Sequence, residues 1–275
     1  MILVDSHCHI DGDAFDEDRD EVVERARQAG VRAMLNVGTG DPHSDDFRRA
    51  VAVAERYDCV YAAVGVHPHD AKLYDDAAEE HLISLVKSSN KVIAWGEIGL
   101  DYYYDHSPGH IQREVFLRQI KVARRLGLPI IVHSRDADED TTEILESEYS
   151  VASDNKSGGL PIGVLHCFGG SPEMAKKLTR IGFKVSFAGN VTFKKAENLR
   201  QAALSVPLNS LLVETDCPYL TPEPFRGKRN EPAYVVNTAK FLAGLYGVEI
   251  AEIASQTTKN FMDLFGVDLT SLENI

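Results

Sequence analysis

Short apolar runs alternate with longer amphipathic stretches along nearly the whole chain, and the alternation recurs about eight times. The short runs are rich in β-branched residues, as in strands, whereas the longer stretches repeat their apolar residues with a helical period. Strands that are apolar on both faces belong to a parallel sheet covered by helices. The pattern therefore predicts an α/β protein built from repeated strand–helix units.

The strands are expected at Ile2–His7, Arg32–Gly38, Tyr61–Val66, Lys91–Glu97, Pro129–His133, Ile162–His166, Lys184–Phe187 and Leu211–Asp216. The helices are expected at Glu17–Ala29, Ser44–Arg56, Asp75–Ser88, His110–Leu126, Ala137–Glu148, Ser171–Ile181, Lys194–Ser205, Ala233–Tyr246 and Glu249–Phe265. Gly30, Gly127 and Gly182 stand where helices end, and Ser44 and Ser171 stand where N-caps are preferred.

Eight such units without a change of composition predict one closed (β/α)8 TIM barrel, a single domain over residues 1–275. The alternative is an open doubly wound sheet, but no glycine-rich fingerprint follows the first strand. The segment Ser153–Pro161 (SDNKSGGLP) is expected to form a surface loop before the sixth strand.

Composition indicates a soluble globular protein, with 44% hydrophobic and 26% charged residues. The first residues lack the features of a signal peptide, and no apolar run approaches the roughly 18 residues of a membrane span. We therefore expect a cytoplasmic protein without a membrane partner, and favour a monomer. Cys8, Cys59, Cys167 and Cys217 are too sparse for a disulfide scaffold. Strand parity predicts that Cys8, Cys167 and Cys217 face the surrounding helices.

The formal net charge of −13 argues against an extended nucleic-acid groove, because such grooves bind phosphates through many Lys and Arg residues. Any contact with DNA must therefore be local. Bound cations would supply much of the missing positive charge.

Polar residues end several of the predicted strands. In a (β/α)8 barrel the C-terminal ends of all strands meet at one mouth, where active sites lie. The nitrogen and oxygen donors expected there are His7, His9, Glu97, His133, His166 and Asp216.

His7 and His9 point to the same side of an extended chain, so both imidazoles can reach one ion. Two half-buried, hydrogen-bonded histidines would be the structural alternative for this pair alone. Six donors exceed the needs of one tetrahedral zinc ion, whereas two divalent ions about 3.5–4 Å apart, bridged by a carboxylate, would use them all. Without cations, such a cluster would be costly to bury.

The ordered segments DSHCH, GVHPH, GEIGLDYY, HSRDA, LHCF, ETDCPYL and RGKRNEP cover nearly the whole chain. Together they resemble the TatD-like deoxyribonucleases of the amidohydrolase superfamily. The resemblance implies a (β/α)8 barrel in which His7, His9, Glu97 and Asp216 surround one ion. It implies that Glu97, His133 and His166 surround the other, with Glu97 bridging.

The resemblance also implies nuclease activity supported by Mg or Mn, although Zn suits four imidazoles better. Many two-metal members of the superfamily use a carboxylated lysine as the bridge, and Glu97 takes that role here. This points away from enzymes of the hydantoinase and dihydroorotase type.

The expected mechanism is attack on phosphorus by a water that loses its proton to the metals and Asp216. Asp216 would act as both ligand and general base, and Glu97 as the bridge. Glu214 shares the strand parity of Asp216, so it either shares the catalytic role or holds a ligand in place.

Substrate contacts are predicted at basic residues, at a run of tyrosines and at one histidine. Arg226, Lys228 and Arg229 form a compact basic cluster after the last strand, and Arg135 follows His133; each could bind phosphate or be an ordinary surface charge. The run Tyr102 to Tyr104 could stack an unpaired base or pack under its loop. The family pattern places His67 near the substrate.

The predicted function is a metal-dependent deoxyribonuclease, 3′–5′ exonuclease-like and preferring single strands or frayed ends. The first alternative is a two-metal hydrolase of a small-molecule or aminoacyl ester or amide, because fold does not fix substrate. The second is a non-catalytic binding protein, which should lack some of the metal ligands.

Overall fold

The computed structural model describes residues 1–149 and 162–270. The segment Ser153–Pro161, predicted to be a surface loop, lies outside the described residues.

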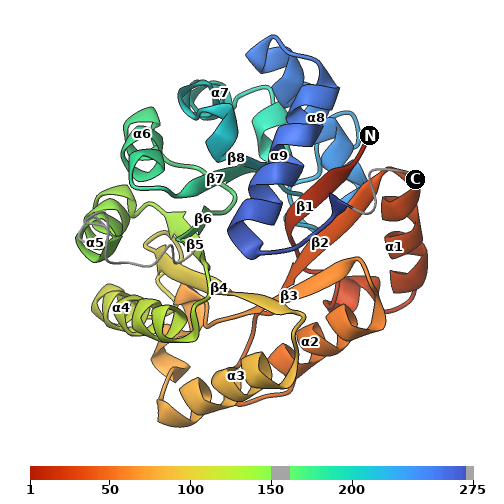
Figure 1. Cartoon of the computed structure of the whole chain (residues 1–275). Helices are drawn as coiled ribbons and strands as arrows, with labels where there is room; N and C mark the ends of the chain where they lie inside the picture. Colours follow the sequence, from red (N-terminus) through yellow and green to blue (C-terminus); the bar gives the residue numbers. More distant parts are fainter. Residues whose placement is uncertain (150–161, 271–275) are drawn as a thin grey trace.

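Eight parallel strands lie in sequence order around the molecule, and helices surround them (Figure 1). The strands are β1 (Leu3–Cys8), β2 (Val31–Val37), β3 (Val60–Val64), β4 (Val92–Asp101), β5 (Ile130–Arg135), β6 (Gly163–Leu165), β7 (Lys184–Phe187) and β8 (Leu211–Val213). This confirms the predicted TIM barrel.

The helices follow the strands as the sequence predicted. They are α1 (Arg19–Gln28), α2 (Asp46–Arg56), α3 (Asp76–Ser88), α4 (Gly109–Leu126), α5 (Asp138–Tyr149), α6 (Pro172–Arg180), α7 (Glu197–Ser205), α8 (Val235–Tyr246) and α9 (Ile250–Phe265). Ser171 caps α6 by accepting the N–H of Met174, whereas Asp45, not Ser44, is the N-cap of α2. Across the described ranges, we find no helix that could serve as a membrane span.

Hydrogen bonds between the segments that follow β1 and β8 close the barrel. The N–H of Asp216 donates to the carbonyl of His7, and the N–H of His9 donates to the carbonyl of Cys217, both at 2.9 Å. Beneath them, the buried carboxylate of Asp5 accepts the N–H of Thr215 at 2.9 Å and its hydroxyl at 2.6 Å. Two metal-ligand candidates from opposite ends of the sequence are thereby fixed side by side.

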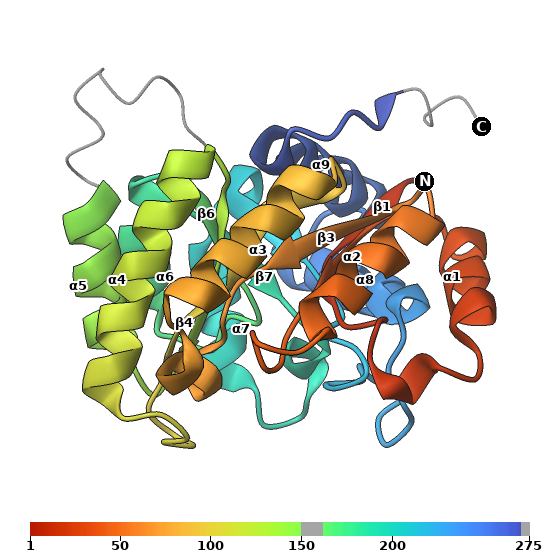
Figure 2. The same cartoon turned by 90° about the horizontal axis from the view of Figure 1, so that it is seen from below.

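The apolar core has two layers. Side chains inside the barrel, such as Leu35 and Ile131, pack against Phe261 and Phe265 of α9. The larger layer lies between the strands and the surrounding helices. Helix α9 crosses the ring of strands in Figure 1 and lies on the side of the N-terminus in Figure 2, so it closes the N-terminal end of the barrel. Polar side chains are left to occupy the opposite mouth.

Two irregularities of strand register turn metal-ligand candidates inward. From Asp5 to Cys8, β1 has one more residue than the paired segment of β2, and β4 has one more than β5 between Trp95 and Ile98. Trp95 faces α4, where its indole N–H donates to Gln119 at 3.1 Å. Simple alternation would turn Glu97 outward in the same way. The extra residue reverses the alternation and aims Glu97 into the mouth.

Phe261 is fully buried where α9 meets the barrel interior. We expect Phe261→Ala to lower the free energy of unfolding by about 3–5 kcal/mol, because it leaves a cavity at the closed end. Urea unfolding followed by far-UV circular dichroism measures the change. The half-exposed Leu204 of α7 gives the control, since Leu204→Ala should change stability by only about 0.5 kcal/mol. Equal effects of both substitutions would contradict this role of α9.

Candidate metal centre

The six candidate ligands converge at the mouth although they come from five strands. His7 lies in β1 and His9 just after it, while Glu97 and His133 lie within β4 and β5. His166 follows β6 directly, and Asp216 lies three residues beyond β8 in a left-handed conformation with φ 54°. The structure thus brings together residues that the sequence placed at strand ends.

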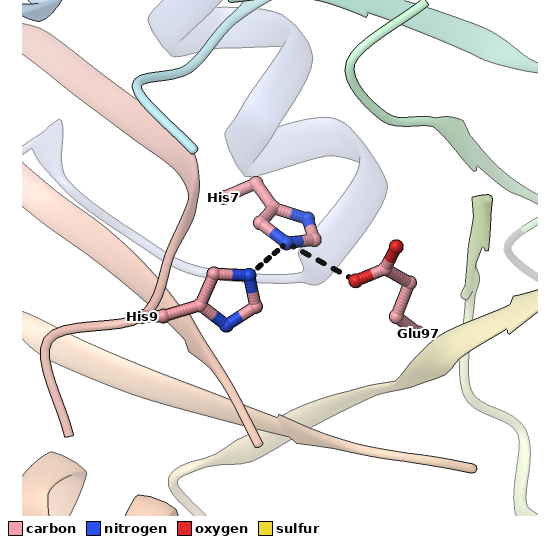
Figure 3. A group of neighbouring side chains, drawn as sticks. All are labelled: His7, His9 and Glu97. Carbon is pink, nitrogen blue, oxygen red and sulfur yellow. Dashed lines mark hydrogen bonds and ion pairs between the residues drawn. The ribbon is translucent and has the colours of Figure 1, made fainter. Parts of the chain in front are cut away.

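One group of donors forms around His7 and His9. Their Nε2 atoms lie 3.1 Å apart, and the His7 Nε2 lies 3.5 Å from Oε2 of Glu97, as Figure 3 shows. Oδ1 of Asp216 lies 3.5 Å from the His9 Nε2 and 3.9 Å from the His7 Nε2. Two imidazoles and two carboxylates therefore surround one small volume.

A second group forms on the other oxygen of Glu97. Oε1 lies 2.6 Å from Nε2 of His166 and 2.8 Å from Nδ1 of His133, and these two nitrogens are 3.4 Å apart. His67 approaches the same oxygen, with its Nε2 at 3.4 Å. Each oxygen of Glu97 thus faces its own set of imidazoles.

Hydrogen bonds to the outer nitrogens of His9 and His133 fix the tautomers of these rings. The tautomer decides that the nitrogen facing the candidate metal site carries a lone pair. Nδ1 of His9 lies 2.7 Å from the carbonyl oxygen of Val37, and Nε2 of His133 lies 3.0 Å from a carboxylate oxygen of Asp101. Because both oxygens only accept, these nitrogens carry the protons. The lone pairs of the neutral rings then point at carboxylate oxygens. Such pairs repel unless a proton or a metal cation lies between them.

The charges of the site favour a cation. Burial lowers the pKa of His9, but the hydrogen bond and charge of Asp216 outweigh burial and raise the pKa to about 9. Burial also opposes protonation of His166, yet the carboxylates of Glu97 and Glu214 hold its pKa well above the usual value. The same negative field that stabilises an imidazolium stabilises a divalent ion.

Glu97 shows the reverse effect. Burial alone would raise its pKa, but the charge of His166 and the hydrogen bond with His133 hold the pKa well below its usual value. The bridging carboxylate is therefore ionised and available as a ligand. Four imidazoles and two carboxylates at these distances suit a divalent metal ion.

Glu214 lies behind His166. Its carboxylate is fully buried, its Oε1 accepts the N–H of Cys167 at 2.7 Å, and the same oxygen lies 3.4 Å from Nδ1 of His166. Glu214 therefore faces the outer nitrogen of His166, while Glu97 faces the inner one.

Asp101 is a functional residue that the sequence reasoning missed. Its Oδ2 accepts from Nε2 of both His133 and His69 at 3.0 Å, and its Oδ1 accepts the N–H groups of Tyr103 and Tyr104 at 3.0 Å. The predicted strand ended at Glu97, whereas β4 continues to Asp101. The signal was its strand parity, because residues 97, 99 and 101 lie on one face.

His67 differs from the six by its tautomer. Its Nδ1 accepts the N–H of His69 at 3.1 Å, so the neutral ring carries its proton on Nε2, toward Glu97. Burial lowers its pKa to about 4, which keeps the ring neutral at pH 7. The Nε2–H of His67 thus faces Glu97 at 3.4 Å, and the expected place of His67 near the substrate stays a prediction.

The predicted substrate residues have different surroundings. Tyr102 is half-buried and donates its hydroxyl to Asp140 at 2.5 Å, which fits the packing alternative. Arg229 is paired with Asp18 at 2.6 Å, so its charge is largely compensated. Arg226 and Lys228 are exposed, with the Arg226 guanidinium 3.9 Å from the centre of the Phe193 ring.

Arg135 ends β5, two residues after His133. Its guanidinium lies 4.0 Å from the centre of the Tyr103 ring and 4.7 Å from that of Tyr104. The predicted phosphate-binding residue is therefore held on aromatic faces close to the metal centre.

Three cysteines were predicted to face the surrounding helices, and the prediction is correct for two of them and wrong for the third. Cys8 and Cys217 are buried in the layer between strands and helices. Cys167 lies beyond the end of β6 in a left-handed conformation with φ 41°, so strand parity does not apply to it. Burial and the charge of Asp216 raise the pKa of its thiol, which keeps it protonated.

A family model described as TatD related DNase matches residues 4–266. The chain belongs to this family. YabD of Bacillus subtilis, described as an uncharacterized metal-dependent hydrolase, is 44% identical over 269 residues, which cover 97% of this chain and all of YabD. YcfH of Escherichia coli, described in the same words, is 42% identical over the full length of both proteins.

The crystal structure of the TatD homologue YJJV from Escherichia coli superimposes with a TM-score of 0.87. It is 33% identical to this TatD-family chain, covering 97% of the chain and 98% of the homologue. The protein is thus a metal-dependent hydrolase of the TatD family, and its clustered His and Glu side chains are where a metal ion fits.

Asp101 should control metal affinity through His133. We expect Asp101→Asn to weaken binding of Mn²⁺ or Zn²⁺ by about 10–100-fold, because one amide group cannot accept both imidazole and both backbone N–H groups. Isothermal titration calorimetry on the metal-free protein measures this. Asp105→Asn is the matched control, since Asp105 is exposed in the same loop. Unchanged affinity in Asp101→Asn would contradict the assigned role.

Proposed function

We propose that the chain hydrolyses phosphodiester bonds in DNA, from the 3′ end and on single strands or frayed ends, with two divalent metal ions. The observation that carries the proposal is the arrangement of Glu97, whose two oxygens each face a separate set of imidazoles. The family description supports DNA as the substrate. The net charge of −13 favours a local contact with a strand end over a long duplex track.

The two donor groups suit two ions. His7, His9, Glu97 and Asp216 would hold one, while Glu97, His133 and His166 would hold the other. Mg, Mn and Zn all remain candidates, with four imidazoles favouring Zn and the phosphate chemistry favouring Mg or Mn. Bound ions would lower the pKa of a water nucleophile and stabilise the negative charge that develops on phosphate oxygens.

Asp216 is the best-placed general base. Its side chain is 14% exposed, whereas that of Glu97 is 5% exposed and that of Glu214 is fully buried. A base must reach the water that it deprotonates, and Asp216 alone of these three carboxylates borders the open part of the mouth. Its position against His9 keeps it within reach of the metal group.

Glu214 serves a different purpose in this proposal. Because it is fully buried and bonded to the Cys167 N–H, it does not reach the substrate. It faces the outer nitrogen of His166 at 3.4 Å and is proposed to orient that ring by its charge, whereas Asp101 accepts a hydrogen bond from His133. Of the two roles predicted for Glu214, we therefore propose that it positions a ligand and does not take part in catalysis.

His67 and Arg135 are proposed to contact the phosphate. The guanidinium of Arg135 matches phosphate oxygens bidentately, and His67 offers a neutral N–H beside Glu97. Arg226 and Lys228 are proposed as weaker contacts to flanking phosphates, because both are exposed beyond β8.

The test is cleavage of single-stranded DNA labelled at its 5′ or 3′ end, with Mg²⁺, Mn²⁺ or Zn²⁺. We expect stepwise loss from the 3′ end, abolished by EDTA and restored by added metal. Asp216→Asn should lower kcat by about 10²–10⁴-fold, because it removes the general base.

Two controls sharpen this experiment. Asp13→Asn changes an exposed carboxylate of the same charge and should leave kcat unchanged. A duplex of the same sequence should be degraded more slowly than the single strand. Absence of DNA cleavage with every metal, together with hydrolysis of an aminoacyl or small-molecule ester, would replace the nuclease proposal by the alternative hydrolase.

A further inference from the structure

Two tyrosines are exposed at the mouth of the barrel. Tyr103 and Tyr104 lie two and three residues beyond the end of β4 and are 58% and 48% exposed, although large aromatic side chains usually lose most of their exposed surface on folding. Their rings meet edge to face, with centroids 4.8 Å apart. Exposed aromatic side chains beside a candidate active site are typical of binding surfaces.

Three contacts hold these rings in place. The guanidinium of Arg135 lies over both rings, and the ring of His106 lies parallel to that of Tyr104 with centroids 5.6 Å apart. Asp101 accepts the N–H groups of both tyrosines through Oδ1. We call Tyr103, Tyr104 and Arg135 the aromatic platform.

The platform is joined to the metal centre by one side chain. The carboxylate that fixes the backbone of Tyr103 and Tyr104 also accepts the Nε2 proton of His133. Arg135 and Asp101 are paired in register across β5 and β4, and His133 and Gly99 are paired two residues before them. The platform therefore stands at a fixed distance from the site of hydrolysis.

A cavity of about 680 Å³ opens beside Arg135, between the end of β5 and the start of α5. Besides Arg135, its walls include Tyr102 and four carboxylate residues, Asp136, Asp138, Glu139 and Asp140. Carboxylates repel a phosphate but accept hydrogen bonds from amino groups. The cavity thus suits an uncharged group that carries N–H donors.

We infer that the aromatic platform and the adjoining cavity bind an unpaired nucleobase next to the phosphate that is cleaved. Base–aromatic stacking tolerates any sequence, and Arg135 adds a cation to the stack. A paired base is already stacked in its duplex, so the platform selects single strands and frayed ends. This inference deepens the proposed nuclease function and rests on it.

The test separates the bases from the phosphates. Fluorescence anisotropy gives the Kd for a fluorescein-labelled single strand in the presence of EDTA. Three proteins are compared: the wild type, the double variant Tyr103→Ala/Tyr104→Ala and the double variant Tyr103→Phe/Tyr104→Phe. An equally long oligonucleotide of tetrahydrofuran abasic units carries the same phosphates without bases.

We expect the double alanine variant to raise Kd for the base-bearing strand about tenfold, the loss of roughly one stacked base. The phenylalanine variant should stay within about twofold, because it keeps both rings. The abasic strand should bind all three proteins equally weakly. Thermal unfolding followed by circular dichroism confirms that the variants fold, as expected for two exposed side chains.

Three results would overturn the platform. The first is an alanine variant with the wild-type Kd for the base-bearing strand, and the second is a phenylalanine variant that binds this strand as weakly as the alanine variant. The third is a wild-type protein that binds neither strand. Cleavage of both strands with added metal is measured in parallel. Base-dependent binding without cleavage would refute the nuclease function and leave the platform in place. Equal binding and equal cleavage of both strands would refute the platform alone.

Discussion

The carboxylate of Glu97 is the contact on which the site depends. It is buried among imidazoles, and their charges and hydrogen bonds outweigh the burial that would otherwise protonate it. Its two oxygens face His7 on one side and His133 and His166 on the other. Removing its charge would leave both groups of histidines without their common partner, so one residue determines whether the mouth can hold cations at all.

A second set of carboxylates lies behind the candidate metal ligands. Asp101 holds the outer nitrogen of His133, and Glu214 lies behind His166. Asp5 fixes Thr215 below Asp216 and so joins the last strand to the first. These residues are buried away from the open mouth. Water therefore cannot compete for their hydrogen bonds. They make the metal ligands rigid before any ion or substrate arrives.

The sequence predicted the barrel and the meeting of the six donors because strand–helix alternation and strand-end polarity are local patterns. It could not show the extra residues in β1 and β4, which reverse the alternation at His7 and Glu97. Asp101 was missed because β4 runs four residues further than its apolar run suggests. Tyr102 and Tyr104 were equivalent in sequence, and only packing separates the half-buried ring from the exposed one.

Under the proposed nuclease function, an acidic protein has to bind an acidic polymer, so its attraction must be confined to a small area. The net charge of −13 opposes approach of a long phosphate chain, and the ion pair with Asp18 compensates Arg229. The mouth offers the field that favours cations, the guanidinium of Arg135 and the exposed rings of Tyr103 and Tyr104. Stacking is nearly independent of salt, whereas phosphate contacts weaken steeply as salt rises. Under the proposed nuclease function, stacking of bases therefore adds to the few phosphate contacts, and it requires a strand whose bases are free.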